Sequence, residues 1–404
     1  MIRLAWRNIW RNRRRSLITT ASVFVAVFLT IVMMSYSNGT WGRMIENMLH
    51  TQTGHIEIHQ KGYWDDKVID NFMTMDNETI VRLRETENIE SVAPRIETFA
   101  LAATEKITKG VAVVGIDPAQ EDKKSRLSRR IVEGNYLDSN DTGILLGKKL
   151  SEYLQIGPGD SLALIGQGYH GASAVGLFPI RGILSLITPE MDRSLLYMTL
   201  PSAQDFISMP DGYSGILIAI KDGNQLKTTM RSVEETINSS MYEILPWTTT
   251  MDRLLKQKET DQLFSIIILV ILYLIVGFGI LGTVLMMTNE RRREFGVMIA
   301  LGMQRGKLSR NVAAELLLMS SLGALTALIV CIPFVWYFHL NPIPLTGEMA
   351  TMMSAYGMEA VLPMDASPSL FISQVVIVLL ITCVTIVYPA HVILKLNANK
   401  AIRS

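Results

Sequence analysis

Four long stretches without a single aspartate, glutamate, lysine or arginine limit what this chain can fold into. They cover residues 16–42, 262–289, 316–347 and 366–394. A helix needs about 20 mostly apolar residues to cross the hydrocarbon core of a bilayer. Buried core helices of a large soluble protein are the alternative, but lysine and arginine are concentrated at one end of each stretch, which favours membrane spans. We predict spans at residues 17–36, 263–288, 312–338 and 370–389.

Positive charge is concentrated in three places, and it predicts the orientation of the spans. Lysines and arginines precede the first span, follow the second and follow the fourth: Arg3, Arg7, Arg11, Arg13, Arg14, Arg15, Arg291, Arg292, Arg293, Arg305, Lys307, Arg310, Lys395, Lys400 and Arg403. The loop between the third and fourth spans has none, and it carries Glu348, Glu359 and Asp365. Because cytoplasmic loops are enriched in lysine and arginine, we predict that both termini lie in the cytoplasm.

This topology divides the chain into alternating compartments. The first apolar run is too long for a typical signal-peptide core and no A-x-A site follows it, so we expect it to remain as an anchor. Between and around the spans we predict a cytoplasmic amphipathic basic segment (1–16), an extracytoplasmic domain (37–247), a stalk helix (248–262), a cytoplasmic segment (289–311), a short external loop (339–369) and a cytoplasmic tail (390–404).

The predicted extracytoplasmic domain alternates strand and helix patterns. Residues 55–59 alternate like a strand, and residues 77–89 have a helical pattern. Residues 125–200 contain more glycine and more strand pattern, so we predict a mixed α/β domain with a mainly β insertion there. The polar residues 248–262 continue without a breaker into the second span, which predicts a stiff stalk.

No stretch of the sequence fits a nucleotide or metal site well. GQGYHG (166–171) matches G-x-G-x-x-G, but a strand pattern follows where a dinucleotide site needs a helix, so a hairpin loop is favoured. GILLGKK (143–149) lacks the spacing and the serine or threonine of a phosphate loop. His55, Glu57 and His59 share one face of a predicted strand, which we interpret as a solvated face rather than a metal site. We therefore expect no catalytic residue, no metal and no cofactor in this chain.

Small residues in the second and third spans, and tryptophans before the first, indicate where helices and lipid meet. Small-xxx-small spacing lets helices approach closely in a bilayer, and it occurs at Gly279, Gly282, Ser320, Gly323, Ala324 and Ala327. These residues fit either a subunit interface or static packing within one subunit. Trp6 and Trp10 lie among arginines at helical spacing, which predicts an interfacial amphipathic helix. Glu315 is expected at the cytoplasmic edge of the third span, near an arginine.

The segment NERRREFGVMIALG (289–302) is the only loop between the second and third spans, and it predicts a short docking helix. A loop kept soluble by its charges would not need the apolar half of this sequence. On a helix, one side would dock and the other would offer charges to a partner. The residues that share a side are Glu290, Glu294 and Val297, and likewise Phe295, Ile299 and Gly302.

This segment also carries a resemblance. NERRREFGVMIALGMQRGKL resembles the E-R-x-x-E-x-G-x-x-x-A-x-G pattern of FtsX-like ABC permeases, a group that includes the MacB efflux permeases and the LolC/LolE lipoprotein-release permeases. The basic start LAWRNIWRNRRRS is similar, and GILLGKKLSEYLQIGPGD resembles part of the MacB-like periplasmic core. The ending YPAHVILKLNANKAIRS departs from the family pattern near Asn399, where proline is usual. The matching positions of the segment are Glu290, Arg291, Glu294, Gly296, Ala300 and Gly302.

The resemblance implies a four-span permease (one span, then three) of the bacterial inner membrane, with an extracytoplasmic α/β domain of MacB-like core type. It implies a mechanotransmitter: a separate cytoplasmic ATPase dimer, which binds the ATP and magnesium, docks on residues 290–302 and moves the spans. A second permease subunit, identical or paralogous, is expected within the membrane lipids, packed through spans one and two. No nucleic-acid partner is implied.

Four functions stay open at this point. A chain of 404 residues without a fused ATPase is similar in layout to LolC/LolE subunits, so lipoprotein release is the leading hypothesis. The alternative is MacB-type efflux of peptides or drugs with a periplasmic adaptor and an outer-membrane duct. Activation of cell-wall hydrolases, as in FtsX itself, usually accompanies a smaller external domain. A membrane scaffold or sensor without transport is a hypothesis of another class.

Overall fold

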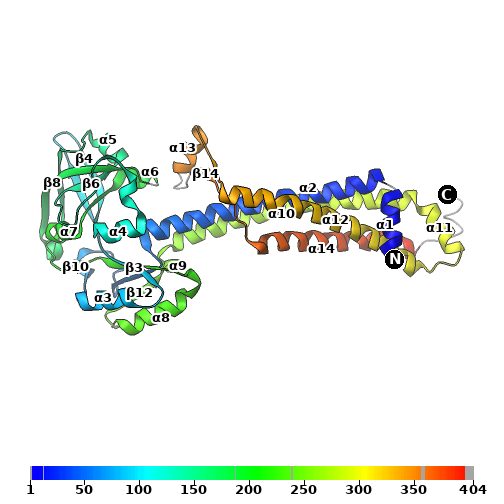
Figure 1. The fold of residues 1–404 in the computed structure, drawn as a ribbon, viewed down its shortest axis with the longest axis horizontal. Coiled ribbons are helices and arrows are strands. Elements are labelled where there is room, and N and C mark those ends of the chain that lie inside the picture. Colours follow the sequence, from blue (N-terminus) through cyan, green and yellow to red (C-terminus); the bar gives the residue numbers. More distant parts are fainter. Residues whose placement is uncertain (1, 12, 187, 238–239, 356–359, 396–404) are drawn as a thin grey trace. The chain divides into compact units, whose positions relative to one another are not determined.

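A computed structural model describes residues 2–11, 13–186, 188–237, 240–355 and 360–395 (Figure 1). The chain forms two compact units. The helical unit consists of Met1–Gly42, Gln257–Pro344 and Val361–Ser404, and the α/β unit consists of Arg43–Lys256 and Leu345–Ala360. Glu359, Lys400, Arg403 and the family-like ending around Asn399 lie outside the described residues.

The helical unit is built from four long helices that run side by side in Figure 1. They are α2 (Arg13–Met48), α10 (Asp252–Glu290), α12 (Arg305–Leu340) and α14 (Pro368–Leu394). Each contains a stretch that is long and apolar enough to cross a membrane. The predicted arrangement of one span followed by three is therefore confirmed. The helices extend beyond the predicted spans because polar turns continue them at one or both ends.

Three short pieces complete the helical unit. They are α1 (Ile2–Arg11), α11 (Arg292–Ala300) and the two-stranded pair of β13 (Ile343–Pro344) and β14 (Val361–Leu362). The core of the unit is formed by side chains that follow one face of α12 and meet α2 and α14. Helix α1 packs against α12, and Ile9 is buried in the same core.

The α/β unit is organised around one ten-stranded mixed sheet with the order β12-β1-β11-β3-β4-β9-β6-β8-β5, in which β7 pairs with β3 and β8. Its strands are β1 (Ile56–Gln60), β3 (Ile89–Ala103), β4 (Thr108–Ile116), β5 (Ile131–Gly134), β6 (Ile144–Gly147), β7 (Ser161–Gln167), β8 (Ser173–Leu184), β9 (Leu195–Thr199), β11 (Gly215–Ile220) and β12 (Tyr242–Pro246). A small pair joins β2 (Met73–Thr74) to β10 (Gly212–Tyr213).

Short helices connect and cover these strands: α3 (Asn77–Glu85), α4 (Pro118–Ser125), α5 (Lys148–Leu154), α6 (Pro189–Ser194), α7 (Leu200–Ile207), α8 (Leu226–Thr236) and α9 (Trp247–Thr250). A further helix, α13 (Glu348–Ala355), lies between β13 and β14 and contacts α6. Capping side chains and prolines in the sequence explain where several of these helices begin. Asp76, Thr188 and Thr199 each cap a helix by accepting a hydrogen bond from a backbone N–H of its first turn. Proline follows two of these caps within two residues. In the first turn a backbone N–H has no partner inside the helix, so proline, which has no N–H, breaks no hydrogen bond there.

The region 125–200 contributes β5 to β9, but it extends the main sheet rather than standing apart as an inserted piece. Strand β9 pairs in parallel with β4, from Ala112 opposite Leu195 to Ile116 opposite Thr199. Strand β7 pairs with the second half of β3. The 15-residue β3 therefore holds the sheet together, because β11 pairs with its first half. The sequence pattern alone gave no such pairing.

The GQGYHG motif is a hairpin loop. Strands β7 and β8 pair antiparallel on either side of it, and Gly168 N–H donates to the Ala172 carbonyl across the loop at 2.7 Å. No helix opens at its third glycine, since the chain passes into β8. The predicted stalk differs from the structure at its start: α9 ends at Thr250, Met251 forms a turn, and α10 then continues without interruption from Asp252 to Glu290.

Candidate functional site

The segment between the second and third spans folds as a helix set between two turns. Helix α10 ends at Glu290, Arg291 forms the turn, and α11 begins at Arg292. Glu290 and Glu294 therefore do not share one helix face, and that prediction is wrong. Gly302 closes the segment with φ +95°, a left-handed conformation that glycine adopts without strain. Its N–H donates to the Ile299 carbonyl.

The side of α11 that was predicted to dock outward is partly used inside the protein. Phe295 is only 1% exposed and belongs to the core of the helical unit, and Gly296 is buried beside it. The predicted shared apolar face of Phe295, Ile299 and Gly302 is therefore not a free surface. Helix α11 is fixed to its own chain through Phe295.

Arg291 forms the electrostatic centre of this segment. Its Nη1 donates to both carboxylate oxygens of Glu315 on α12, at 2.9 and 3.2 Å, and both side chains are buried. Its Nε donates to Glu294 at 3.4 Å, and its guanidinium lies 5.4 Å from the Phe295 ring centroid. The expectation that Glu315 lies near an arginine is confirmed. Arg291 thus connects the turn before α11 to α12.

Glu294 is also engaged within the chain. Arg11, at the end of α1, donates to its carboxylate at 3.1 Å. More than half of both side chains is exposed, so this ion pair contributes little to stability. Glu294 therefore joins α1 to α11 in this conformation.

The segment has an exposed charged part at its start, formed by residues 289–290 and 292–294, and an exposed apolar part at its end. Val297, Leu301 and Met303 are exposed, Leu301 by 83%, and Ala300 is exposed between them. A shallow hollow of about 470 Å³ lies here, lined by Met298, Leu301, Gly302, Met303, Gln304 and Lys307. An isolated exposed leucine needs no explanation, but Leu301 and Met303 line the hollow together and, with the exposed Val297 nearby in sequence, offer a contact surface.

The small residues of the spans fall into two groups with different surroundings. Those of α12 are buried: Ser320, Gly323, Ala324 and Ala327. A Cβ on Gly323 would lie 2.7 Å from the Thr20 carbonyl oxygen and 2.8 Å from the Val23 Cβ, so α2 approaches too closely for any side chain there. Around Gly279 and Gly282 of α10, no described atom lies within 4 Å of where a Cβ would be. Packing within the subunit therefore accounts for the α12 group alone.

The tryptophans predicted as interfacial anchors lie together on α1. Trp6 and Trp10 are exposed, and their rings meet edge to face with centroids 6.2 Å apart. The guanidinium of Arg13 lies 5.3 Å from the Trp10 ring. The two rings therefore form an exposed aromatic surface on α1, with the first residue of α2 adding a positive charge beside it.

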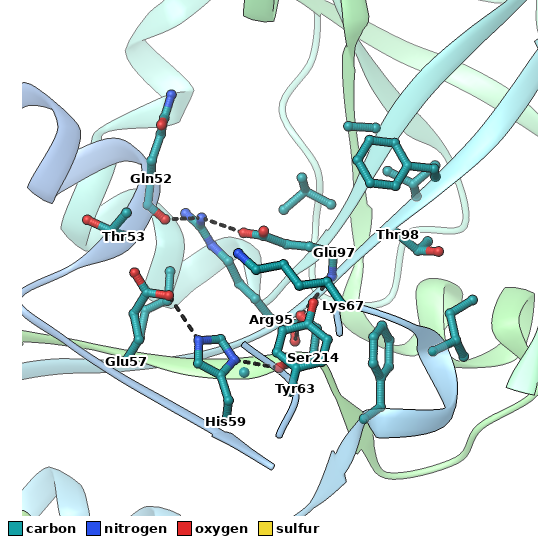
Figure 2. A pocket seen from close by; sticks show the side chains of 18 of the residues that line it. Gln52, Thr53, Glu57, His59, Tyr63, Lys67, Arg95, Glu97, Thr98 and Ser214 are labelled. Carbon is teal, nitrogen blue, oxygen red and sulfur yellow. Dashed lines mark hydrogen bonds and ion pairs between the residues drawn. The ribbon is translucent and has the colours of Figure 1, made fainter. Parts of the chain in front are cut away.

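The α/β unit contains a cavity of about 600 Å³ that the sequence did not indicate (Figure 2). It is lined by β1, β3, β4, β9, β11 and the π-helical turn Leu49–Thr53 that follows α2. Glu57 and His59 on β1 line it and are almost fully buried, so the interpretation of this strand face as solvated is wrong. His55 is half-buried. Among the described residues, no group of three metal-binding side chains is close enough together to hold an ion.

The buried polar groups of this cavity form two linked pairs. His59 Nδ1 lies 2.8 Å from the Ser214 carbonyl oxygen, and Nε2 lies 3.0 Å from Glu57 Oε2 (Figure 2). The carbonyl requires a proton on Nδ1, so the bond to Glu57 requires a second proton on one of the two partners. The Tyr63 ring stacks on the imidazole at 5.0 Å.

Arg95 on β3 is the other centre of the cavity wall. It forms a two-point ion pair with Glu121 of α4 at 2.6 and 3.1 Å, and it donates to the carbonyls of Thr51 and Gln52. Burial is the largest single effect and opposes the charge on Arg95, but Glu121, Glu97 and the hydrogen bond to Glu121 together raise the pKa of Arg95 above its usual value. Likewise burial opposes ionisation of Glu121, and Arg95 nevertheless lowers its pKa.

Arg95 also fastens the chain where it enters the α/β unit. The turn Leu49–Thr53 follows α2, and Arg95 holds two of its carbonyls. The chain leaves the unit beside this point, because β1 pairs antiparallel with β12, from Ile56 opposite Pro246. Trp247 N–H, at the start of α9, donates to the His55 carbonyl. Entry and exit therefore lie on adjacent, hydrogen-bonded strands.

Comparison with known proteins agrees with both units. Residues 16–236 match the MacB-like periplasmic core domain, and residues 266–398 match the FtsX-like permease C-terminal domain. The chain is 23% identical to the lipoprotein-releasing system transmembrane protein LolC of Xylella fastidiosa (strain 9a5c), over 78% of each chain. It is 20% identical to LolE of Haemophilus influenzae, over 76% of this chain and 75% of LolE.

A second group of relatives is longer. The macrolide export ATP-binding/permease protein MacB 2 of Aeromonas hydrophila is 20% identical over 88% of this chain, which spans 56% of that protein. The periplasmic region of MacB from Actinobacillus actinomycetemcomitans aligns in structure with 53% of this chain and 98% of its own, with 14% identity and a TM-score of 0.38. The predicted fold class, four spans with a MacB-like α/β core, is confirmed. The chain belongs to the MacB-type, FtsX-like family of ABC transporter permeases and is a multi-pass membrane protein.

Proposed function

We propose that this permease is a mechanotransmitter that releases lipoproteins from the bacterial inner membrane, driven by a separate cytoplasmic ATPase. The observation that carries this proposal is the similarity to two proteins named as lipoprotein-releasing system transmembrane proteins, LolC over 78% of this chain and LolE over 76%. No phosphate-loop motif is present in the sequence.

The distribution of lysine and arginine supports an orientation with both termini and α11 in the cytoplasm. We call residues 289–302, between the second and third spans, the coupling segment. An ATPase dimer holding ATP and magnesium would then contact the exposed end of this segment. Leu301 and Met303 at the hollow, together with the exposed Val297, are the apolar side chains available for this contact. Among the family positions, Ala300 and Gly302 lie on this exposed surface, while Arg291 and Gly296 hold the segment in place.

The connections at the α/β unit support the transmission of motion. The chain enters through a turn fixed by Arg95 and leaves through β12, which pairs with the strand that follows this turn. Movement of either connection would act directly on a hydrogen-bonded sheet rather than on a loose loop. Helix α10 is unbroken from Asp252 to Glu290, which makes it stiff enough to carry such movement.

A second permease subunit is expected to pack against α10. Gly279 and Gly282 have open space beside them in this chain, and glycine in a span allows close approach of another helix. The subunit is identical or paralogous. In this arrangement the small residues of α12 stabilise each subunit, and those of α10 serve the contact between subunits.

Export of peptides or drugs through a periplasmic adaptor and an outer-membrane duct is the second candidate. It is favoured by the match of residues 16–236 to the MacB-like periplasmic core and by the MacB relatives. A membrane scaffold without transport would need no ATPase at the coupling segment.

The test is a mild-detergent purification of the full chain from its native membranes, followed by mass spectrometry. Recovery of an ATPase with acylated lipoproteins would support lipoprotein release, and an adaptor with an outer-membrane duct would favour efflux. Leu301→Asp should remove the ATPase from the purified complex. Val132→Asp, at an equally apolar exposed position of β5, is the control that should retain it. If the Leu301→Asp chain retains the ATPase, this contact surface is wrong.

A further inference from the structure

The start of the chain carries positive charge that the protein itself does not neutralise. Residues 1–15 contain six arginines, whereas residues 1–45 contain no aspartate or glutamate. Arg7, Arg13 and Arg14 are exposed, and among the described residues no carboxylate forms an ion pair with any of the three. Exposed charge of one sign without a counter-charge attracts a ligand of the opposite sign, so this surface is suited to an anion from outside the chain.

Packing within the helical unit fixes which side of α1 is exposed. Ile9 is buried in the core of this unit, and Ser16 Oγ donates to the Ile9 carbonyl at 3.1 Å, which closes the turn into α2. Trp6 and Trp10, one helical turn apart, remain exposed. Helix α1 packs against α12 and runs across the direction of the four long helices (Figure 1). An amphipathic helix that lies across membrane spans at their end lies along the membrane surface.

Two arginines and an exposed aromatic ring meet at Trp10. The guanidinium of Arg13 lies 5.3 Å from the centroid of the Trp10 ring. Arg7 precedes Trp10 by three residues, and residues at this spacing are neighbours on a helix surface. Two guanidinium groups beside one position suit a phosphate group, because each offers several N–H donors in a fixed planar arrangement. Arg11 has a different role, since it pairs with Glu294 at 3.1 Å.

The place of this surface in the chain indicates that the phosphate belongs to a lipid. Helix α1 ends at Arg11 and α2 begins at Arg13, and the first candidate span starts at Ser16 within α2. The charged surface therefore lies at the depth of lipid headgroups, where tryptophan is enriched in membrane proteins. A free phosphate ion would use the arginines but would leave the exposed tryptophan rings without a partner.

We propose that Arg7, Arg13 and Trp10 form a binding site for the headgroup of an anionic phospholipid. The two guanidinium groups bind the phosphate, and the site selects against phosphatidylcholine, whose quaternary ammonium would lie beside the same positive charges. The inference rests on the helical unit alone, and it depends neither on the ATPase nor on the transported substrate. Because Arg11 of the same helix holds Glu294 of α11, a lipid bound here would also restrain the coupling segment.

The test measures lipid binding to the purified full chain by native mass spectrometry. The probes are phosphatidylglycerol and phosphatidylcholine with identical acyl chains, so that the two lipids differ in the headgroup alone. One arginine near an anionic headgroup changes affinity by about fivefold. With two arginines in the site, phosphatidylglycerol should therefore bind about 20-fold more tightly than phosphatidylcholine.

Three variants test the site, and a fourth controls for charge in general. Arg7→Gln and Arg13→Gln should each reduce the preference for phosphatidylglycerol by about fivefold, because each removes one guanidinium group. Trp10→Leu should reduce the preference by about threefold, because Arg13 loses the ring beside it. Arg310→Gln removes the same charge from an exposed position of α12 and should change the preference by less than about twofold.

Three results would overturn the proposal. The first is equal affinity of the unaltered chain for the two lipids. The second is a loss in Arg310→Gln as large as that in Arg7→Gln and Arg13→Gln, which would show an effect of net charge without a site. The third is displacement of bound phosphatidylglycerol by millimolar glycerol 1-phosphate, which would indicate a site for soluble phosphates. A chain without any lipid preference that still retains its ATPase would reject this site and leave the proposed function standing.

Discussion

The buried pair of Arg291 and Glu315 gives the sharpest stability prediction for this permease. The two side chains are 7% and 2% exposed. Removing one partner of a buried pair leaves the other charge desolvated and unpaired, which typically costs about 3–5 kcal/mol. Glu315→Gln keeps the shape and removes the charge. Because Arg291 retains its 3.4 Å contact to the exposed Glu294, we expect a loss at the lower end of that range, about 3 kcal/mol.

The assay is reversible unfolding of the full chain in dodecylmaltoside by titration with sodium dodecyl sulfate, followed by tryptophan fluorescence. The double variant Arg291→Met with Glu315→Met removes both charges together and should recover most of the loss, because no buried charge remains. Arg11→Gln is the control. It breaks the exposed ion pair with Glu294 and should cost less than about 1 kcal/mol.

Two outcomes would refute this reasoning. If Glu315→Gln lowers the free energy of unfolding no more than Arg11→Gln does, burial does not determine how much the ion pair of Arg291 and Glu315 contributes to stability. If the double variant is as unstable as the sum of the single variants Arg291→Met and Glu315→Met, the two side chains act independently. The same cycle should show whether α11 holds its position, since release of Arg291 would also loosen Phe295.

Three further predictions follow from the structure. Burial, and then the neighbouring Arg95, lower the pKa of Lys124 to about 7 from 10.5, so between these values the unfolded state binds more protons than the native state. The unfolding free energy should therefore rise with pH from about 7, by up to about 1.4 kcal/mol per pH unit, and Lys124→Met should abolish this rise in denaturation measured at pH 6, 7, 8 and 9. Gly323→Ala should lower the unfolding free energy by about 1–3 kcal/mol in the same detergent titration, because its Cβ would overlap α2, and an unchanged unfolding free energy would argue against this packing. Gly279→Leu should leave the stability of the single chain within about 0.5 kcal/mol but shift the complex toward one permease subunit in native mass spectrometry; retention of two subunits would place the interface elsewhere.

Much of the candidate site could be predicted from the sequence because it depends on local patterns. The position of the coupling segment follows from the charge-free stretches on either side of it, and these can be recognised without tertiary information. The internal geometry of the segment could not be predicted from the sequence. Whether Glu290 and Glu294 share a face depends on the turn at Arg291, and that turn forms where Arg291 reaches Glu315 on another helix.

The cavity was missed for a different reason. Alternation along β1 shows that His55, Glu57 and His59 point the same way, but it cannot tell whether water or protein covers that face. Of the covering groups, Ser214 is 155 residues from His59 in sequence. Tyr63 and the turn after α2 lie just outside β1, but their positions over this face depend on the fold. Two polar residues at spacing two give the same pattern on a solvated strand and on a cavity wall.

The sequence by itself determined the four spans, their one-then-three order and the family, because membrane insertion and short motifs are properties of contiguous residues. Only the tertiary structure decided which small residues pack inside the subunit, which charges are paired and where the α/β unit is hollow. Those features depend on the approach of distant segments, such as Thr20 to Gly323 and Thr51 to Arg95. Such contacts form at distances set by the whole fold, and no local pattern encodes them.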